Sequence, residues 1–525
     1  MWLSVKALLL GQTSVRLNLS ANLVSKILAA LVSLACVPIY IRILGAAGYG
    51  VIGIWATLET LAKLLDMGLS PTMTRELAAT ARRTEEAQLI RDLVRTIEVF
   101  YWTFGLLIGA TIMLCAPLIA TRWLRSSQLS SGELLTSVQL IGILILCRWP
   151  LSFYSSGLNG LERQVLLSWM DFVFALLRSF GAVVVLVFIS PTILAFLGWQ
   201  IAINILNTGI IAASLWWSLP AGRASRFRAK LLIRVWRFAG GVTAIALVSM
   251  LLTDLDKLVV SGLVSLEDFG YYTLASRMAG TLYLAASSVF AAVYPALVRF
   301  ATEQNEAKFA ELYHLAAQML SLLVFPAAIT AAVFARPLIF AWTGNEHIAD
   351  NTAPIAALLI IGTAFHCTGF LPYAAQLGHG WTSLAFWTNL SYVPVTTVLL
   401  IVFTRRFGGE GAAAVWLLIT TSYYATQIPL MHRRILRYHA RRWYINDIGI
   451  PLVACSLTAG LLAAAIGPTT TRIGAALTVG LAGLLVGTAG LLATPLVRKE
   501  LHDLWIQYHA RTIKIRSQAR ERSGS

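Results

Sequence analysis

Long apolar segments follow one another along almost the whole chain. Each is long enough to cross a hydrocarbon layer of roughly 30 Å as a helix. We count fourteen such segments: 16–44, 47–66, 95–120, 133–157, 167–189, 193–219, 238–262, 269–298, 309–335, 353–376, 382–404, 410–430, 447–466 and 473–495. Backbone groups inside a bilayer must find their partners within the protein, so segments of this kind fold as helices. The sequence therefore predicts an all-α polytopic membrane protein with about fourteen transmembrane helices and no separate soluble domain.

Composition agrees with this fold class. The 525 residues are 58% hydrophobic and only 12% charged, whereas about a quarter of the residues in a soluble domain are charged. The net charge of +17 would also fit a nucleic-acid-binding protein. We predict no nucleic-acid partner, because the basic residues follow the predicted loops. The five cysteines lie inside apolar segments without a C-x-x-C pair, which indicates buried hydrophobic residues rather than disulfides or metal ligands.

The loops differ in basic charge. Most loop lysines and arginines fall on the side of the membrane that holds the N-terminus, and that side is predicted to be cytoplasmic. An even number of spans places both termini there. The arginines predicted for the opposite side are Arg122, Arg125, Arg336, Arg405, Arg406 and Arg472.

The two halves of the chain repeat one pattern. Residues 45–50 (GAAGYG) join the first two spans, and residues 264–270 (VSLEDFG) join spans seven and eight at the corresponding place. Both copies begin on the same side, so we predict two six-helix lobes in parallel pseudo-repeat plus two C-terminal helices. The predicted parts are an N-terminal lobe (1–221), a basic cytoplasmic linker (222–237), a C-terminal lobe (238–431), the last two spans with their basic loop (432–497) and a basic cytoplasmic tail (498–525).

Seven cationic residues lie within predicted spans. A single one can snorkel to the interface or pair with an acid, but cations spread over both lobes indicate a positively charged central cavity. Such a cavity suits an anion, because arginine binds phosphate through two parallel hydrogen bonds and lysine binds it as a point charge. The candidate substrate-binding residues are Lys26, Lys63, Arg148, Arg178 and Arg277, together with Arg42 and Lys257, whose places near span ends favour a structural role.

Five acidic residues also lie within predicted spans. Glu59 and Lys63, and likewise Asp171 and Arg178, have spacings that allow local neutralisation on one helix. Asp66 ends the second span, where it can hold the turn. A buried carboxylate can also titrate or bind sodium during transport. The candidate ion-coupling residues are Asp254, Asp256, Asp66, Asp171 and Glu59.

No catalytic constellation is present in the sequence. There is no Walker A motif and no Gly-x-Ser-x-Gly elbow, and the eight histidines lack metal-ligand spacing. We therefore predict no catalytic residue, no metal and no cofactor. A glycan polymerase or ligase would present a sizeable extracytoplasmic loop, and the predicted loops on that side are short.

The stretch 18–76 resembles the N-terminus of bacterial polysaccharide flippases of the Wzx type, which belong to the multidrug/oligosaccharidyl-lipid/polysaccharide exporter superfamily. The matching residues are Asn18, Asn22, Pro38, Tyr40, Arg42, Leu44, Gly45, Tyr49, Gly50, Asp66, Gly68, Leu69, Thr74, Arg75 and Glu76. The resemblance implies transport of an undecaprenyl-diphosphate-linked oligosaccharide from the cytoplasmic to the periplasmic leaflet of the inner membrane by alternating access. It implies a role in O-antigen or exopolysaccharide biosynthesis, with the lipid-linked oligosaccharide, membrane lipids and a polysaccharide polymerase or export machinery as partners.

Three alternatives stay open. A lipid II-type flippase of the same superfamily would differ in its substrate, and a drug or cation antiporter would favour acidic cavity residues. A membrane glycan polymerase or ligase is the enzymatic alternative. The glycine- and alanine-rich last two spans fit either close helix packing, which we favour, or the groove for an isoprenoid tail that the resemblance to lipid II flippases implies.

Overall fold

The computed structural model describes residues 13–66, 68–80, 87–231, 248, 251–467, 469–503, 505 and 506, and these residues form helices and their connections without any strand. Eleven helices in this part of the chain are long and apolar enough to cross a membrane. The prediction of an all-α, multi-pass membrane protein is confirmed. The predicted count of fourteen spans is not confirmed.

Two of the eleven helices each contain two predicted spans. α2 (Thr13–Leu64) is kinked at Gly45, which has φ 73°. α16 (Thr382–Ala425) is kinked at Gly408, which has φ 58°. Glycine adopts positive φ without a steric penalty, so the chain bends where the sequence predicts turns. The predicted span 238–262 lies largely outside the described residues, of which 251–263 are helical.

Residue contacts divide the chain into two compact units. The first comprises residues 1–274 and 386–415, and the second comprises residues 275–385 and 416–525. The first unit thus takes in parts of the predicted C-terminal lobe. The predicted domain boundaries at 221, 237, 431 and 497 stay predictions.

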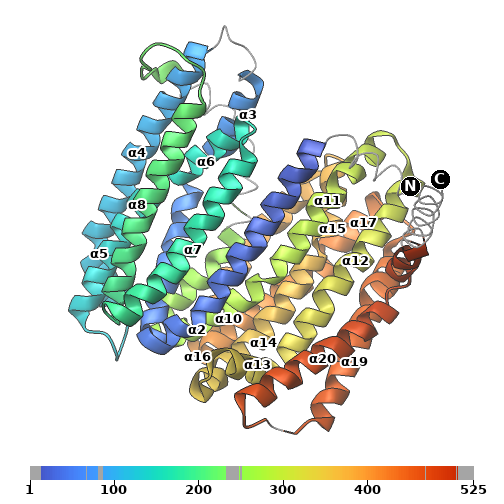
Figure 1. Cartoon of the computed structure of the whole chain (residues 1–525). Coiled ribbons are helices and arrows are strands. Elements are labelled where there is room, and N and C mark those ends of the chain that lie inside the picture. The colour runs from blue at the N-terminus through green and yellow to red at the C-terminus, as the bar shows by residue number, and fades with distance from the viewer. Residues whose placement is uncertain are drawn as a thin grey trace, which may run out of the picture. The chain divides into compact units, whose positions relative to one another are not determined.

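The first unit contains a bundle of long helices. α4 (Ala87–Leu118), which continues as the π-helix η2 (Ile119–Trp123), packs on α5 (Ser131–Arg148), and α5 packs on α8 (Ile193–Ser218). α7 (Gln164–Phe188) lies against both α8 and α2 (Figure 1). The short helices α3 (Leu69–Thr80) and α6 (Leu151–Gly160) contact each other. Charged side chains of α2, α5 and α7 are thereby brought within reach of one another and of polar side chains of α8.

The two segments that the sequence predicts to be repeats contact each other in this unit. A methyl group added at Gly50 would lie 2.3 Å from the carbonyl oxygen of Leu266, in α10 (Leu266–Gly280). One added at Gly270 would lie 2.1 Å from the carbonyl oxygen of Ala46. Neither distance is compatible with a side chain, so the reciprocal contact between α2 and α10 requires glycine on both helices.

The described part of the predicted basic linker lies along α4. Arg228 Nε is 2.7 Å from Asp92 Oδ2, and Asp92 is fully buried. The backbone N–H of Arg226 donates to Asp92 Oδ1 at 2.9 Å, and that of Arg228 donates to Thr96 Oγ1 at 2.9 Å. Asp92 and Thr96 of α4 therefore hold residues 226 and 228 in place.

The second unit is arranged around α12 (Glu306–Val333). It also contains α11 (Leu282–Thr302), α13 (Ala335–Thr343), α14 (Glu346–Thr368), α15 (Phe370–Gly378), α17 (Gln427–Arg434) and α18 (Ala440–Arg442). α12 contacts α11 and α14. Its buried residues lie on most of its circumference, as expected for a helix surrounded by others.

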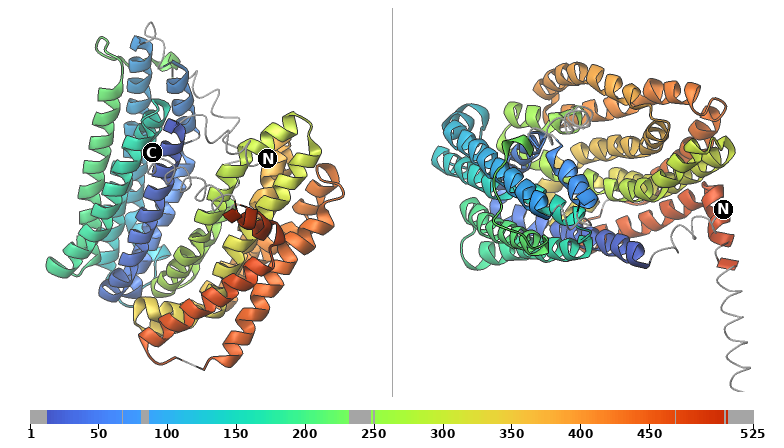
Figure 2. Two further views of the ribbon diagram at one scale, coloured as in Figure 1. Left: turned by 45° about the vertical axis from the view of Figure 1, so that its right-hand side comes forward. Right: turned by 90° about the horizontal axis from the view of Figure 1, so that it is seen from above.

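Two helices near the C-terminal end of the described chain form a hairpin on α12. The π-helix η3 (Trp443–Gly449) leads into α19 (Ile450–Ala465), which packs on α20 (Arg472–Leu492), and both contact α12 (Figure 2). A methyl group at Gly490 would lie 2.8 Å from Pro326 Cγ of α12. The small residue allows α20 to approach α12 closely, as the helix-packing alternative predicts.

Candidate functional site

A polar cluster lies among the transmembrane helices of the first unit. Glu59 Oε1 on α2 accepts a hydrogen bond from Arg148 Nε, at the end of α5, at 2.8 Å. The same oxygen lies 2.9 Å from Lys63 Nζ. Arg148 Nη1 donates to the amide oxygen of Asn204, on α8, at 2.8 Å. With Arg178 of α7, these four residues form what we call the Glu59 cluster.

Local helix geometry explains how the cluster is held. Glu59 and Lys63 are four residues apart and therefore share one face of α2. Asn204 Nδ2 donates to the carbonyl oxygen of Gln200 at 2.7 Å, which orients the amide oxygen of Asn204 toward Arg148. Gln200 Nε2 in turn donates to the carbonyl oxygen of Arg178 at 3.3 Å.

The cluster carries an excess of positive charge. Arg178 is half-buried and interacts electrostatically with Arg148, Glu59 and Asp171, and the last of these is exposed on the same helix. Lys63 and Arg148 thus pair directly with the carboxylate of Glu59, and Arg178 interacts with Glu59 and Asp171 without an ion pair to Glu59. The Glu59 side chain is only 14% exposed, whereas that of Arg148 is 24% and that of Lys63 is 55% exposed. The acid is covered and the cations remain accessible, an arrangement that can bind an anion.

The other candidate cations are not part of this cluster. Arg42 and Arg277 are exposed. Lys257 belongs to a second cluster, described below. The side chain of Lys26 lies outside the described residues. The structure therefore brings together Lys63, Arg148 and Arg178 of the seven predicted residues.

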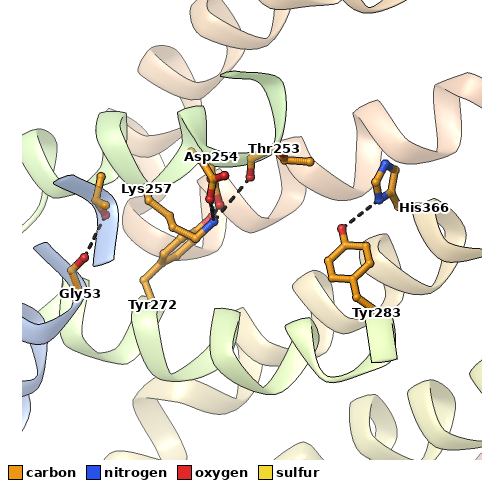
Figure 3. Close-up of polar contacts among 9 residues, drawn as sticks. Gly53, Thr253, Asp254, Lys257, Tyr272, Tyr283 and His366 are labelled. Atoms are coloured by element: carbon orange, nitrogen blue, oxygen red, sulfur yellow. Dashed lines mark hydrogen bonds and ion pairs between the residues drawn. The ribbon is translucent and has the colours of Figure 1, made fainter. Parts of the chain in front are cut away.

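The second cluster surrounds Lys257 in the first unit. Lys257 Nζ lies 2.9 Å from Asp254 Oδ1 and 3.5 Å from Asp256 Oδ1. The hydroxyl of Tyr272 donates to Asp256 Oδ2 at 2.6 Å. Figure 3 shows Lys257 beside Asp254, with Tyr272 approaching from α10. Two carboxylates thus share one ammonium group in this cluster.

The remaining acidic candidates have separate positions. Asp66 accepts hydrogen bonds from the backbone N–H of Ser70 at 3.3 Å and from its hydroxyl at 2.8 Å. It also accepts one from the hydroxyl of the fully buried Tyr101. Asp66 thereby fastens the start of α3 to α4. Asp171 is exposed.

Sequence reasoning missed two buried polar sites. Glu98 on α4 accepts hydrogen bonds from the Tyr154 hydroxyl at 2.7 Å, from Trp216 Nε1 at 3.0 Å and from Arg95 Nη1 at 2.7 Å. The spacing of Arg95 and Glu98 was a signal for this site. The second site joins His314 to Asp447, and no local pattern connects residues so far apart in sequence.

Solved structures of transporters share this fold. The chain is similar to the lipid II flippase MurJ in an inward closed conformation, with a TM-score of 0.64 and 16% identity, covering 92% of this chain and 99% of the other. It is also similar to an inward-facing multidrug resistance transporter of the MATE family and MOP superfamily, with a TM-score of 0.60 and 13% identity, covering 81% of this chain and 99% of the other. The fold is that of a membrane flippase or transporter.

Sequence comparison identifies the family. The family model described as "Polysaccharide biosynthesis protein" matches residues 39–349. A "Putative O-antigen transporter" of Shigella flexneri is 20% identical over 395 residues, which is 75% of this chain and 92% of the relative. The chain belongs to this polysaccharide biosynthesis family, and the predicted membership in the Wzx-type flippases is confirmed.

Proposed function

We propose that this protein moves an undecaprenyl-diphosphate-linked oligosaccharide from the cytoplasmic to the periplasmic leaflet of the bacterial inner membrane. The observation that carries the proposal is the Glu59 cluster, in which two cations pair with one covered carboxylate and a third, Arg178, interacts with it electrostatically within a membrane-spanning bundle. Its product would supply a polysaccharide polymerase or export machinery.

The chemistry of the cluster fits a diphosphate. A charge inside a membrane is costly unless a counter-ion or water compensates it. Glu59 compensates part of the charge of Lys63, Arg148 and Arg178, and an anionic ligand would compensate the rest. Arg148 already uses Nε and Nη1 for Glu59 and Asn204, which fixes the plane of its guanidinium group and leaves its remaining N–H groups for phosphate oxygens.

Transport would proceed by alternating access. The diphosphate and glycan would bind within the bundle while the isoprenoid tail remains in the bilayer, and the lobes would then rock to open outward. With both termini in the cytoplasm, an inside-negative membrane potential favours outward movement of the anionic headgroup. The gain is about 2.3 kcal/mol per uncompensated charge per 100 mV.

The two clusters of charged residues do not fit the alternative transport functions equally well. A lipid II-type flippase carries the same diphosphate on a different glycan, so the Glu59 cluster suits it equally. A drug or cation antiporter is favoured by the Asp254 and Asp256 pair, but Lys257 already occupies that pair.

The test is headgroup translocation in proteoliposomes with a fluorescent undecaprenyl-diphosphate oligosaccharide. We expect activity in the wild type, its collapse in Arg148→Gln and Arg178→Gln, and normal activity in the control Arg336→Gln. Arg336 is an exposed arginine that pairs with Asp350 at 2.6 Å outside these clusters. Full activity in both cluster variants would overturn the site. Glycan chain growth without translocation by the wild type would identify a polymerase instead.

A further inference from the structure

A buried chain of ionisable side chains lies in the second unit. His314 of α12 and Asp447 of η3 have fully buried side chains, and His314 Nδ1 is hydrogen-bonded to Asp447 Oδ2. His314 Nε2 lies 2.8 Å from Nδ1 of His439, which precedes α18 and is partly exposed. We call His439, His314 and Asp447 the His–Asp relay. It connects a buried carboxylate to the surface through two imidazole rings.

The hydrogen bonds of the relay have one consistent arrangement when both rings are neutral. Asp447 as a carboxylate only accepts, so His314 Nδ1 carries the proton and His314 Nε2 accepts. His439 Nδ1 then donates to His314, and His439 Nε2 keeps a free lone pair. All donors point inward, toward Asp447.

This arrangement can carry a proton inward with every atom accounted for. A proton binds His439 Nε2, and the proton on His439 Nδ1 passes to His314 Nε2. The proton on His314 Nδ1 then passes to Asp447 Oδ2. Each ring gains one proton and loses one, so both become the opposite neutral tautomers, and the net change is one proton from the surface onto Asp447.

Asp447 also holds parts of the unit together. Gln318 Nε2 of α12 donates to Asp447 Oδ1 at 2.9 Å, and Ser321 Oγ donates to the Asp447 carbonyl oxygen at 2.6 Å. Gln318 Oε1 accepts from the backbone N–H of Leu496, just beyond α20, at 2.9 Å. Protonation of Asp447 removes the charge from its bond with Gln318, and hydrogen bonds to a charged acceptor are about twice as strong as neutral ones.

We propose that the His–Asp relay is the binding site for a coupling proton, which enters at His439, resides on Asp447 and loosens the α19–α20 hairpin from α12. The inference rests on the proposed transport function, because a coupling proton has a role only if the protein transports a substrate. The π-helix that carries Asp447 agrees with it, since single-turn π segments within helices are frequent at functional sites.

Few other charges face the relay in the described part of the chain. His439 interacts electrostatically with Glu306 of α12 and Arg442 of α18, and His432 interacts with both relay histidines. Tyr313 interacts electrostatically with Asp447 and Tyr444. α19 has no charged residue, and α20 has only Arg472, which binds the carbonyl oxygens of Ala341 and Trp342. Burial, His314 and Arg442 lower the pKa of His439, so its imidazole is neutral at pH 7 and able to accept a proton.

The first test is hydrogen exchange of the full-length protein in lipid nanodiscs between about pH 8 and about pH 5.5, corrected for intrinsic exchange. In the wild type, we expect acidification to lower the hydrogen-exchange protection factors of η3 and α19 roughly tenfold. This is the effect expected when a hydrogen bond to a charged acceptor is weakened. His439→Gln and His314→Gln should flatten this response, and Asp447→Asn should show low protection at every pH. The matched control is His366→Gln, which removes a half-buried histidine bound to Tyr283 at 2.9 Å (Figure 3) and should respond like the wild type.

The second test is translocation driven by an imposed pH gradient. We expect the gradient to accelerate transport in the wild type and in His366→Gln but not in His439→Gln, which alters only the partly exposed end of the relay. A wild-type exchange response that equals that of the relay variants would overturn the proton site. An exchange response without gradient-driven transport would overturn the coupling role. The exchange experiment needs no substrate, so a wild type that fails to translocate would refute the proposed function separately.

Discussion

Arg148 Nε and Lys63 Nζ share a single oxygen of Glu59, at 2.8 and 2.9 Å. The carboxylate therefore holds two cations from different helices at one point in the membrane. A shared acceptor places like charges closer together than their repulsion alone would allow. Glu59 is in this respect a positioning residue, and it leaves the cluster with an excess positive charge.

A double-substitution cycle separates the structural from the binding role of this pair. Glu59→Gln should lower the free energy of unfolding by about 1–3 kcal/mol, because both cations lose their charged acceptor. Glu59→Gln/Arg148→Gln should regain part of that stability, since glutamines can hydrogen-bond without charge. Translocation should be lost in both proteins. Thermal unfolding in detergent and the proteoliposome assay measure the two effects, and recovery of transport in the double variant would contradict a binding role for Arg148.

The reciprocal contact between α2 and α10 should be intolerant of side chains. Gly270→Ala should destabilise the protein by about 1–3 kcal/mol through overpacking, because the new methyl group would meet the Ala46 carbonyl oxygen. Gly198→Ala in α8 is the matched control, since nothing lies within 4 Å of its added methyl group. The melting temperatures of both variants test this prediction. Equal melting temperatures would show that the contact between α2 and α10 adjusts to the added methyl group without loss of stability.

Release of the linker from α4 should be detectable by proteolysis. Asp92→Asn removes the charge that holds Arg228 and leaves a weaker acceptor for the backbone N–H of Arg226. Trypsin should then cleave after Arg226 and Arg228 several-fold faster. Glu303→Gln, which weakens an exposed pair with Arg299 at 3.7 Å, should leave these cleavage rates unchanged. Equal rates in the two variants would mean that Asp92 does not hold the linker.

Removal of Lys257 should expose the cation-binding capacity of its acidic neighbours. Lys257→Met leaves Asp254 and Asp256 without their shared ammonium group. Because these side chains are partly exposed, the free energy of unfolding should fall by less than the about 3–5 kcal/mol lost when a fully buried ion pair is broken. Sodium should raise the melting temperature of Lys257→Met and have less effect on Lys257→Met/Asp256→Asn. An equal sodium effect on both proteins would remove Asp256 from the candidate ion-coupling residues.

Acid should destabilise the protein through His439. Burial, His314 and Arg442 lower the pKa of this group below its usual value. The unfolded chain therefore binds more protons than the folded chain near this residue, and stability falls as the pH drops through about 6.5. His439→Gln should show a shallower decline of melting temperature between about pH 7 and about pH 5. An unchanged slope would assign the acid sensitivity to other groups.

Several local features of this protein were predictable from short stretches of sequence. The spacing of Glu59 and Lys63 predicts their pairing on α2, because side chains four residues apart share a helical face. Gly45 marks a predicted turn and is the site of the kink in α2. The count of fourteen membrane-spanning helices stays a prediction, and α2 and α16 each consist of two helical segments that meet at Gly45 and Gly408.

The sequence by itself determined the all-α membrane fold and the family, because long apolar segments leave the backbone no alternative in lipid and short motifs carry the resemblance. The tertiary structure decided which charges meet. Arg148 joins Glu59 and Asn204, and His314 joins Asp447, although these partners are distant in sequence. Such contacts depend on how each helix is rotated and packed against its neighbours, and the local pattern of residues leaves that rotation open.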